Sequence, residues 1–267
     1  EVSWSSNFNI SFNKNKVLEV GVDGRPIYGS AANANNAFIT KPGYPIASFY
    51  GYKYIGVFQS EEELAKYPHL SGDKVGDGRY EDVNKDGVLD QNDKTILGDN
   101  NPLFTAGFSN SFSYKNFTLD IQFTGSYGAE VFSFYKRMCG IYHGDRNGMI
   151  EQLGRWQSKD QPGDGIHFRP TRTPSGWQRD PSSAWVQDAS YLRLRNLTLG
   201  YNFDQKVLDK MKMKGLRLYV TGQNLFTITN YVGYDPETSS ESGLAQGGDY
   251  LGYPAARSFI IGANITF

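Results

Sequence analysis

Residues 104–127, FTAGFSNSFSYKNFTLDIQFTGSY, contain two alternating runs of apolar and polar side chains. Apolar residues take mostly even positions before Lys115-Asn116 and odd positions after it. A period of two is typical of a β-strand whose two faces meet different surroundings. A two-residue connection joins antiparallel neighbours. The stretch therefore predicts a β-hairpin with one apolar and one polar face.

The same alternation continues in both directions along the chain. It recurs in 2–12, 215–228 and 257–267, and in 190–203 with one change of parity that predicts a bulge near Arg195-Asn196. These segments are long for a soluble sandwich and suit a tilted membrane-spanning strand. Their ends are rich in aromatic residues, as in the interfacial girdles of membrane barrels: Trp4, Phe12, Tyr114, Phe117, Tyr201, Phe203 and Phe267.

The predicted fold class is all-β, a transmembrane antiparallel β-barrel. The chain supplies about seven wall strands, which cannot close alone and would leave unpaired edges in lipid. The expected strands, running inward and outward in turn from the first, are 2–12, about 16–22, 103–114, 117–134, 190–203, 215–228 and 257–267.

Connection lengths orient this barrel, because periplasmic turns are short and outer loops are long. Lys115-Asn116 and 13–16 are therefore expected in the periplasm, as is 204–215 with a small helix. The long segments of approximately 23–102, 135–189 and 229–256 are expected outside. The strand-like segment 46–58 is assigned to the first outer loop.

Composition excludes several other classes of protein. The formal net charge of -1 gives no basic footprint for nucleic acid. The single cysteine, Cys139, cannot form an internal disulfide and is expected to be a bystander. The chain opens in strand pattern at Val2, so a leader peptide is expected to lie outside this sequence.

No catalytic constellation emerges, so the chain is not expected to be an enzyme. His69, His143 and His167 lack metal-ligand spacing, and neither a nucleophile elbow nor a phosphate loop is present. A soluble glycan-binding β-sandwich remains the rival from another class, because it also alternates and is aromatic-rich. Solubility without detergent would distinguish the two.

Several stretches in a fixed order resemble the SusC/RagA-type TonB-dependent transporters of Bacteroides-like bacteria. The resemblance covers nearly the whole chain and rests on order and spacing rather than on one motif. The stretches are GYPI (43–46), FYGY (49–52), DVNKDG (82–87), GF (107–108), FSYK (112–115), YLRLRNLTLGY (191–201), LYVTGQNLF (218–226), GYDPE (233–237) and the end from GYP (252–254) to Phe267.

The resemblance implies a barrel of about 22 strands, of which this chain is the C-terminal portion. The N-terminal plug, the TonB box and the remaining barrel would lie outside this sequence. Family members form dimers of transporter–lipoprotein pairs, in which a SusD-like lipoprotein captures a glycan or peptide and closes as a lid. TonB-ExbB-ExbD then acts on the plug.

The expected function is TonB-dependent import of an oligosaccharide or oligopeptide across the outer membrane of a Gram-negative cell. A siderophore or corrinoid importer, which would work without a lipoprotein lid, is the alternative within the same class.

The segment 82–93 matches the spacing of an EF-hand-type calcium loop. Alternate residues of such a loop supply the six to eight hard oxygens that calcium prefers, and Gly87 at position 6 permits the sharp turn. Position 12 is Asp93 rather than the usual Glu, and flanking helices are not expected. A structural calcium ion is predicted, held at positions 1, 3, 5, 7, 9 and 12 by Asp82, Asn84, Asp86, the Val88 carbonyl, Asp90 and Asp93. A polar turn cluster without an ion is the alternative.

Two further expectations concern the last strand and the loop aromatics. The alternation of Phe259, Ile261, Ile265 and Phe267 resembles the terminal signal read by the barrel-insertion machinery. Aromatic loop residues could stack on sugar rings, but packing under the loops is the preferred interpretation; they are Tyr142, Trp156, Trp177, Trp185 and Tyr231. A short amphipathic helix is expected over 147–157.

Overall fold

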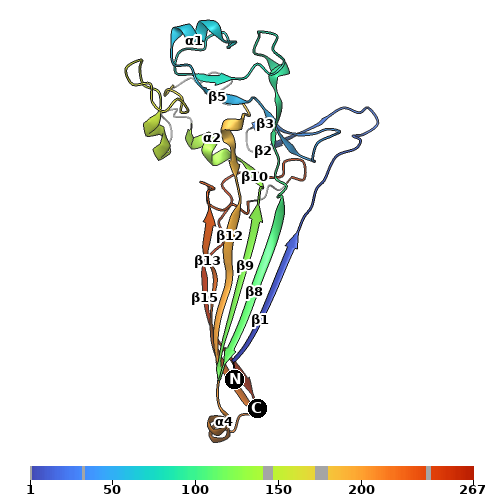
Figure 1. Cartoon of the computed structure of the whole chain (residues 1–267), viewed down its shortest axis with the longest axis vertical. Coiled ribbons are helices and arrows are strands. Elements are labelled where there is room, and N and C mark those ends of the chain that lie inside the picture. The colour runs from blue at the N-terminus through green and yellow to red at the C-terminus, as the bar shows by residue number, and fades with distance from the viewer. Residues whose placement is uncertain (1, 32–33, 141–146, 172–179, 239–241) are drawn as a thin grey trace.

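The computed structural model describes residues 2–31, 34–140, 147–171, 180–238 and 242–267. A tall, curved sheet forms one part of the chain, and shorter elements gather at one end of it (Figure 1). We call this sheet the wall. The described residues of 12–103, 128–190 and 230–257, which connect wall strands at that end, are called the head.

The wall has six antiparallel strands in the order β1-β8-β9-β12-β13-β15. Neighbours in the sheet are also successive wall strands in the chain, although parts of the head separate β1 from β8, β9 from β12 and β13 from β15. This arrangement is the meander that the alternating pattern predicts. The strands are β1 (Val2–Ser11), β8 (Phe104–Tyr114), β9 (Phe117–Tyr127), β12 (Tyr191–Asn202), β13 (Gly215–Thr229) and β15 (Ser258–Thr266).

The strand register aligns the apolar faces of all six strands. Phe108 of β8 lies opposite Phe8 on one side and Phe123 on the other. Farther along the sheet, Leu199 lies opposite Val220. The aromatic rings also meet across strands: Trp4 stacks on Phe112 with centroids 5.9 Å apart. One continuous apolar face therefore results, because a strand alternates with a period of two and the pairing keeps like opposite like.

Two bulges interrupt the wall near its head end. The register of β12 shifts between Leu194 and Asn196 against both neighbours, which confirms the predicted bulge. On β13, Asn224 adopts a left-handed backbone with φ of 51°. Asn tolerates this conformation better than most residues, so the extra residue of the second bulge is placed there.

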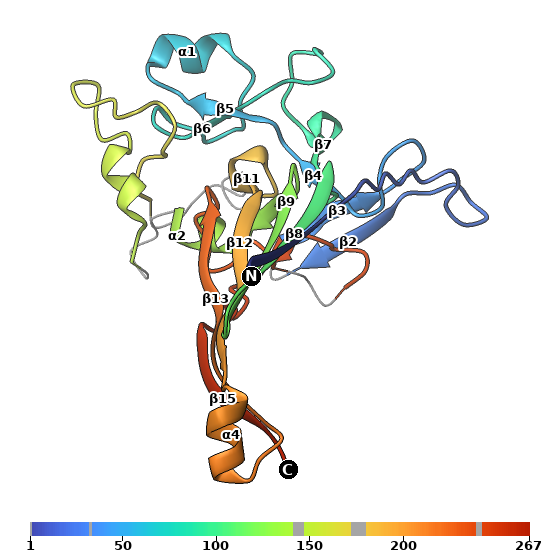
Figure 2. The same ribbon diagram turned by 60° about the horizontal axis from the view of Figure 1, so that its bottom comes forward.

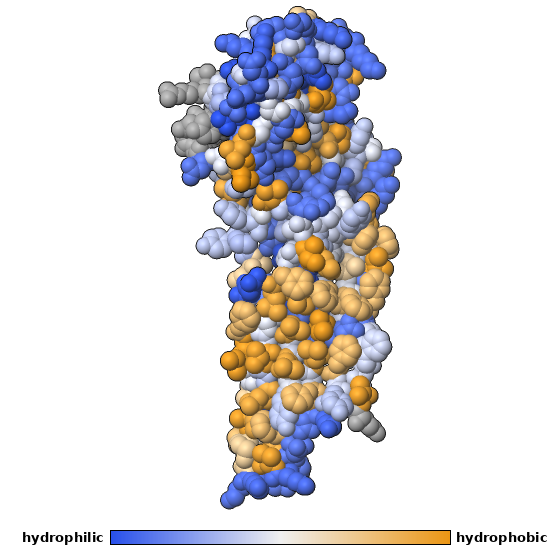
Figure 3. Space-filling view, turned by 60° about the vertical axis from the view of Figure 1, so that its left-hand side comes forward, coloured by the Kyte–Doolittle hydropathy of each residue, from blue (hydrophilic) through white to orange (hydrophobic). Residues whose placement is uncertain are grey.

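The apolar face of the wall is not covered by another layer in the described part of the chain. Phe259 and Ile261 are 72% and 83% exposed. Figure 3 shows the corresponding apolar band along the wall, with hydrophilic surface at both ends. A soluble sandwich would pack a second sheet on this face. The uncovered band favours the membrane barrel over that rival.

The segment 16–22 is not a wall strand, so the prediction of seven strands was wrong. Val20 is buried, and the backbone of Val17 bonds to that of Gly43 and Tyr44 in the head. Gly21 has φ of +52°, which turns the chain there. The alternation of 16–22 therefore reflects packing in the head, where Val20 is buried. Residues 13–16 do not form the expected periplasmic turn, and β1 runs toward the head rather than away from it.

The head contains three small sheets, formed by β2-β3-β4-β7, β5-β6 and β11-β10-β14. Its main core gathers aromatic residues from the first two connections, including Phe38, Phe132 and Trp185, and the third connection adds Ala245. The strands are β2 (Ile27–Ala31), β3 (Ala34–Thr40), β4 (Ser48–Gly51), β5 (Tyr54–Val57), β6 (Gly78–Tyr80), β7 (Thr95–Gly98), β10 (Glu130–Ser133), β11 (Val186–Asp188) and β14 (Gly248–Asp249). As predicted, 46–58 contributes strands to the head.

The helices are short and lie outside the wall. In the head they are α1 (Glu61–Lys66), α2 (Phe134–Gly140) and the 3-10 helices η1 (Gln91–Asp93), η2 (Ile150–Gly154) and η3 (Ser183–Trp185). Helix α4 (Gln205–Met211) confirms the helix expected within 204–215, and Figure 2 shows it at the end of the wall opposite the head. In the described ranges, no helix has the length and apolar character needed to cross a membrane.

Candidate functional site

The polar face of the wall is joined across strands by hydrogen bonds between short side chains. Ser111 donates to Asp120 over 2.6 Å, and the hydroxyls of Thr198 and Thr221 lie 2.8 Å apart. Hydroxyl and carboxylate groups of this kind suit a hydrated surface. The face is therefore the candidate lining of the barrel lumen.

At the head end of this polar face, five side chains form an ion and hydrogen-bond network. We call it the mouth cluster: Tyr191, Arg193, Arg195, Asp235 and Glu237. Arg193 lies at its centre, with a side chain only 3% exposed. The four remaining members surround it from β12 and from the connection between β13 and β15.

Arg193 forms the most buried contacts of the mouth cluster. Its Nη2 lies 2.6 Å from Asp235 Oδ1, its Nη1 pairs with Glu237, and its Nε donates to Thr227 over 2.8 Å. The register places Arg193 opposite Thr227 on the polar face. The ion pairs therefore hold segment 235–237 over the candidate lumen rather than over the apolar face.

The bulge on β12 adds a second arginine to the same cluster. Arg195 pairs with Glu237, and its Nε donates to Thr124 over 3.0 Å. The bulged Asn224 donates through Nδ2 to the Ala256 carbonyl over 3.1 Å. Both bulges thus contribute side chains that bind the connection between β13 and β15.

The charge balance of the cluster favours ionised carboxylates. Burial alone would raise the pKa of Asp235, but hydrogen bonds from the Arg193 guanidinium and from the N–H groups of Ala255 and Glu237 outweigh it and hold the pKa below its usual range. A buried arginine with two carboxylates is satisfied only while both remain in place. The cluster therefore fixes the connection between β13 and β15 at the head end of the candidate lumen.

The predicted calcium loop forms a compact turn in the head. Asp82 accepts the N–H groups of Lys85 and Gly87 at 2.7 and 2.8 Å. Asp93 is fully buried and accepts the N–H groups of Val83 and Asp90 at 2.9 and 2.8 Å. Gly87 has φ of +84°, as the predicted sharp turn requires.

The fit of calcium to this loop is only partial. The side chains of Asn84 and Asp86 bond to each other, and Asp90 and Asp93 form a capping box at η1. Within the described residues, no group of three or more His, Cys, Asp or Glu side chains is arranged to hold a metal ion. The donor types suit calcium, but an ion would have to replace backbone contacts. The calcium site stays a prediction.

The proposed assembly signal lies on the uncovered apolar face of β15. Phe259, Ile261 and Ile265 are exposed there, as is Phe267 directly after the strand, and β15 bonds along one edge to β13. Exposure of these side chains is compatible with contact to an insertion factor or to lipid. The signalling role stays a prediction, which a Phe267→Ala variant tests through the amount of assembled barrel.

Most of the loop aromatics that the structure describes pack inside the head. Trp185 and Tyr231 are buried, and Trp156 packs against the main core. This confirms packing for these three residues, whereas Tyr142, Trp177 and His143 lie outside the described residues. The expected helix over 147–157 is the shorter 3-10 helix η2.

The sequence patterns did not identify the mouth cluster. Its members lie in the stretches YLRLRNLTLGY and GYDPE, which carry the family resemblance. Charged residues inside an otherwise apolar alternation were the available signal. Their pairing joins positions 42 and 44 residues apart, which no local pattern reveals.

Comparisons with known proteins agree with this architecture. No protein-family model matches the chain. TonB-dependent receptor P3 of Formosa agariphila is 34% identical over 278 residues, covering 100% of the chain and 27% of that protein. TonB-dependent receptor SusC of Bacteroides thetaiotaomicron is 26% identical over 100% of the chain and 25% of its own length. The chain thus spans about a quarter of these relatives.

The fold has a close counterpart among solved structures. The RagAB peptide transporter matches with a TM-score of 0.75 and 22% identity, over 100% of the chain and 27% of that structure. The names of these proteins describe receptors and transporters, in agreement with the prediction that the chain is not an enzyme. The chain belongs to the SusC/RagA-type TonB-dependent transporters and forms part of their β-barrel.

Proposed function

We propose that the protein containing this chain imports a nutrient across the outer membrane in a TonB-dependent manner. This proposal rests mainly on the two different faces of the wall. Its apolar face is uncovered, and the side chains of its polar face are hydrogen-bonded across strands. A wall of this kind separates hydrocarbon from a hydrated passage. The names of the relatives supply the TonB dependence of the proposal.

The proposed cargo is an oligosaccharide or an oligopeptide, and the proposed partner is a SusD-like lipoprotein. The head supports this assembly, because three long connections pack into one aromatic core at the same end of the wall. A head with its own core offers a stable platform for a lid. The mouth cluster fixes one of these connections beside the proposed passage.

Growth of a deletion strain tests the import function. Loss of the gene should abolish growth on one glycan or peptide, and the intact gene should restore it only when TonB is active. Normal growth of the deletion strain on every glycan and peptide that supports the parent strain would contradict the proposal. Growth defects confined to iron or corrinoid limitation would instead identify a siderophore or corrinoid importer.

Purification in mild detergent tests the partner. A SusD-like lipoprotein should copurify with the transporter, and removal of head segment 61–80 should reduce its recovery more than removal of α4 does. Recovery of the barrel alone under every mild detergent condition would contradict the paired assembly.

We also propose a structural calcium ion in the loop 82–93. The supporting features are the donor types, their spacing and the positive φ of Gly87. The ion would be held by Asp82, Asn84, Asp86, Val88, Asp90 and Asp93, and it would stiffen this part of the head.

A further inference from the structure

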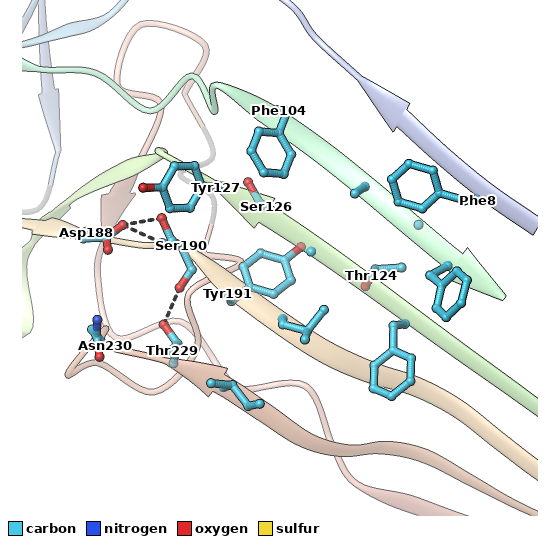
Figure 4. Close-up of a pocket in the computed structure, with 17 residues that line it drawn as sticks. Phe8, Phe104, Thr124, Ser126, Tyr127, Asp188, Ser190, Tyr191, Thr229 and Asn230 are labelled. Carbon is cyan, nitrogen blue, oxygen red and sulfur yellow. Dashed lines mark hydrogen bonds between the residues drawn. The ribbon is translucent and has the colours of Figure 1, made fainter.

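The apolar face of the wall contains a hollow close to the head. Ala106 and Gly125 lie opposite each other in the β8–β9 pair and form its floor. The aromatic pair Phe104 and Tyr127 lies on the head side of this floor, with ring centroids 5.4 Å apart. A second aromatic row lies on the other side, where Phe108 is paired with Phe8 and Phe123. Figure 4 shows the labelled rings around the hollow.

The hollow has a volume of about 470 Å³. Leu192 and Ile228 extend its apolar lining across β12 and β13. Asp188, Ser190 and Asn230 form a polar rim where the wall meets the head. Asp188 accepts hydrogen bonds from the backbone and hydroxyl of Ser190. The hollow is thus mostly apolar along the wall, and Asp188 supplies a carboxylate acceptor at its head end.

We propose that this hollow binds one acyl chain of an outer-leaflet lipid. The inference rests on the proposed function, because only a membrane-spanning wall turns this face toward hydrocarbon. Small floor residues between bulky rings leave a space that the neighbouring side chains do not fill. An empty space there would forfeit dispersion contacts, whereas an acyl chain restores them. The polar rim lies where a headgroup with hydroxyl or ammonium donors would be.

The shape of the hollow favours a lipid over a protein partner. A stable protein interface buries about 800 Å² on each partner, whereas this hollow is confined to the ends of a few strands. It is also continuous with the apolar band that faces outward along the whole wall (Figure 3). An acyl chain that lies along this band can enter the hollow without losing its contact with the surrounding lipid hydrocarbon.

The test compares lipid retention by the full-length transporter and two variants. Ala106→Leu fills the floor of the hollow. Ala263→Leu makes the same change on the same face of β15, where Ala263 lies opposite Leu218 and outside the hollow. Native mass spectrometry counts the molecules of lipid A, an outer-leaflet lipid, that remain on each delipidated protein after titration with that lipid.

We expect Ala106→Leu to retain one lipid fewer than the parent protein, with roughly tenfold weaker binding at this site, and Ala263→Leu to match the parent. Ala106→Val serves as a milder filling variant if the leucine prevents assembly. Equal retention by the parent and the filling variants would overturn the proposal. The proposal would also be overturned if the filling variants changed the number of barrel copies in the assembly. The same holds if the bound acyl chain proved to be covalently attached to a copurified protein.

Heat-modifiable migration of the parent protein separates this inference from the proposed function. A parent protein that migrates as a folded barrel but shows no lost lipid in the filling variants contradicts only the lipid site. A parent protein that never enters the membrane fraction overturns both.

Discussion

Arg193 of β12 and Asp235 of the connection between β13 and β15 form a 2.6 Å ion pair on the polar face of the wall. Their side chains are only 3% and 11% exposed. Glu237 binds the same arginine and also Arg195, so two neighbouring carboxylates bind two arginines of one strand. The pair therefore adds a buried attachment between the wall and this connection, which also pairs through β14 with β10 and accepts a hydrogen bond from Asn224 at the Ala256 carbonyl.

Replacing Arg193 by Met should release this connection from the wall. Asp235 would lose its main cation and Glu237 one of its two, and breaking a buried ion pair on one side costs about 3–5 kcal/mol. Hydrogen exchange in 230–238 should increase accordingly in the folded protein.

The matched control for this variant is Arg217→Met on the same face. Arg217 lies 3.8 Å from Asp120 in a more exposed pair, which contributes about 0–1 kcal/mol. Equal exchange in 230–238 for both variants would show that the mouth cluster does not hold the connection.

The same connection should respond to acid but not to mild changes of pH. The pKa of Asp235 is lowered in the folded protein, so its ionisation stabilises the fold fully above the unfolded pKa of about 4. That contribution is lost as the pH falls from about 4 through the lowered value. Protection of 230–238, corrected for intrinsic exchange rates, should stay constant from about pH 7 to 5 and fall below about pH 4. A loss already complete at pH 5 would contradict this assignment.

The wall strands could be predicted from sequence because the alternation of apolar and polar residues lies within each strand. The change of parity after Leu194 even located the bulge of β12. The segment 16–22 misled the prediction because its alternation serves the head, where Val20 is buried. The mouth cluster was not predictable, since the partners of Arg193 lie on a connection whose path over the polar face depends on the whole sheet.

Calcium should protect the head if the loop 82–93 binds it. Adding calcium to chelator-treated protein should reduce hydrogen exchange across 82–93, and Asp86→Ala should abolish that response. Asp160→Ala removes an exposed carboxylate elsewhere in the head and should leave the response unchanged. An identical calcium response in both variants, or none in the parent protein, would favour the ion-free turn.

The two faces of β13 should differ in their tolerance of charge. Val220 lies on the apolar face and is 48% exposed, whereas Gln223 pairs with Asn196 on the polar face. Val220→Arg should destabilise the inserted barrel by about 2–4 kcal/mol near the membrane centre. Gln223→Arg should have little effect. The measurement is the amount of folded, heat-modifiable barrel in the outer membrane, and equal amounts for both variants would contradict the assignment of faces.

The central claim is that the wall spans the outer membrane with the head outside the cell. Cysteine labelling of intact cells tests it most directly, in full-length protein that carries Cys139→Ser. One variant has Ser71→Cys, an exposed site in the head, and the other has Lys210→Cys, an exposed site in α4. An impermeant maleimide should label position 71 in intact cells and position 210 only after the outer membrane is opened. Labelling of position 210 in intact cells, or of neither position until the cells are opened, would contradict the account.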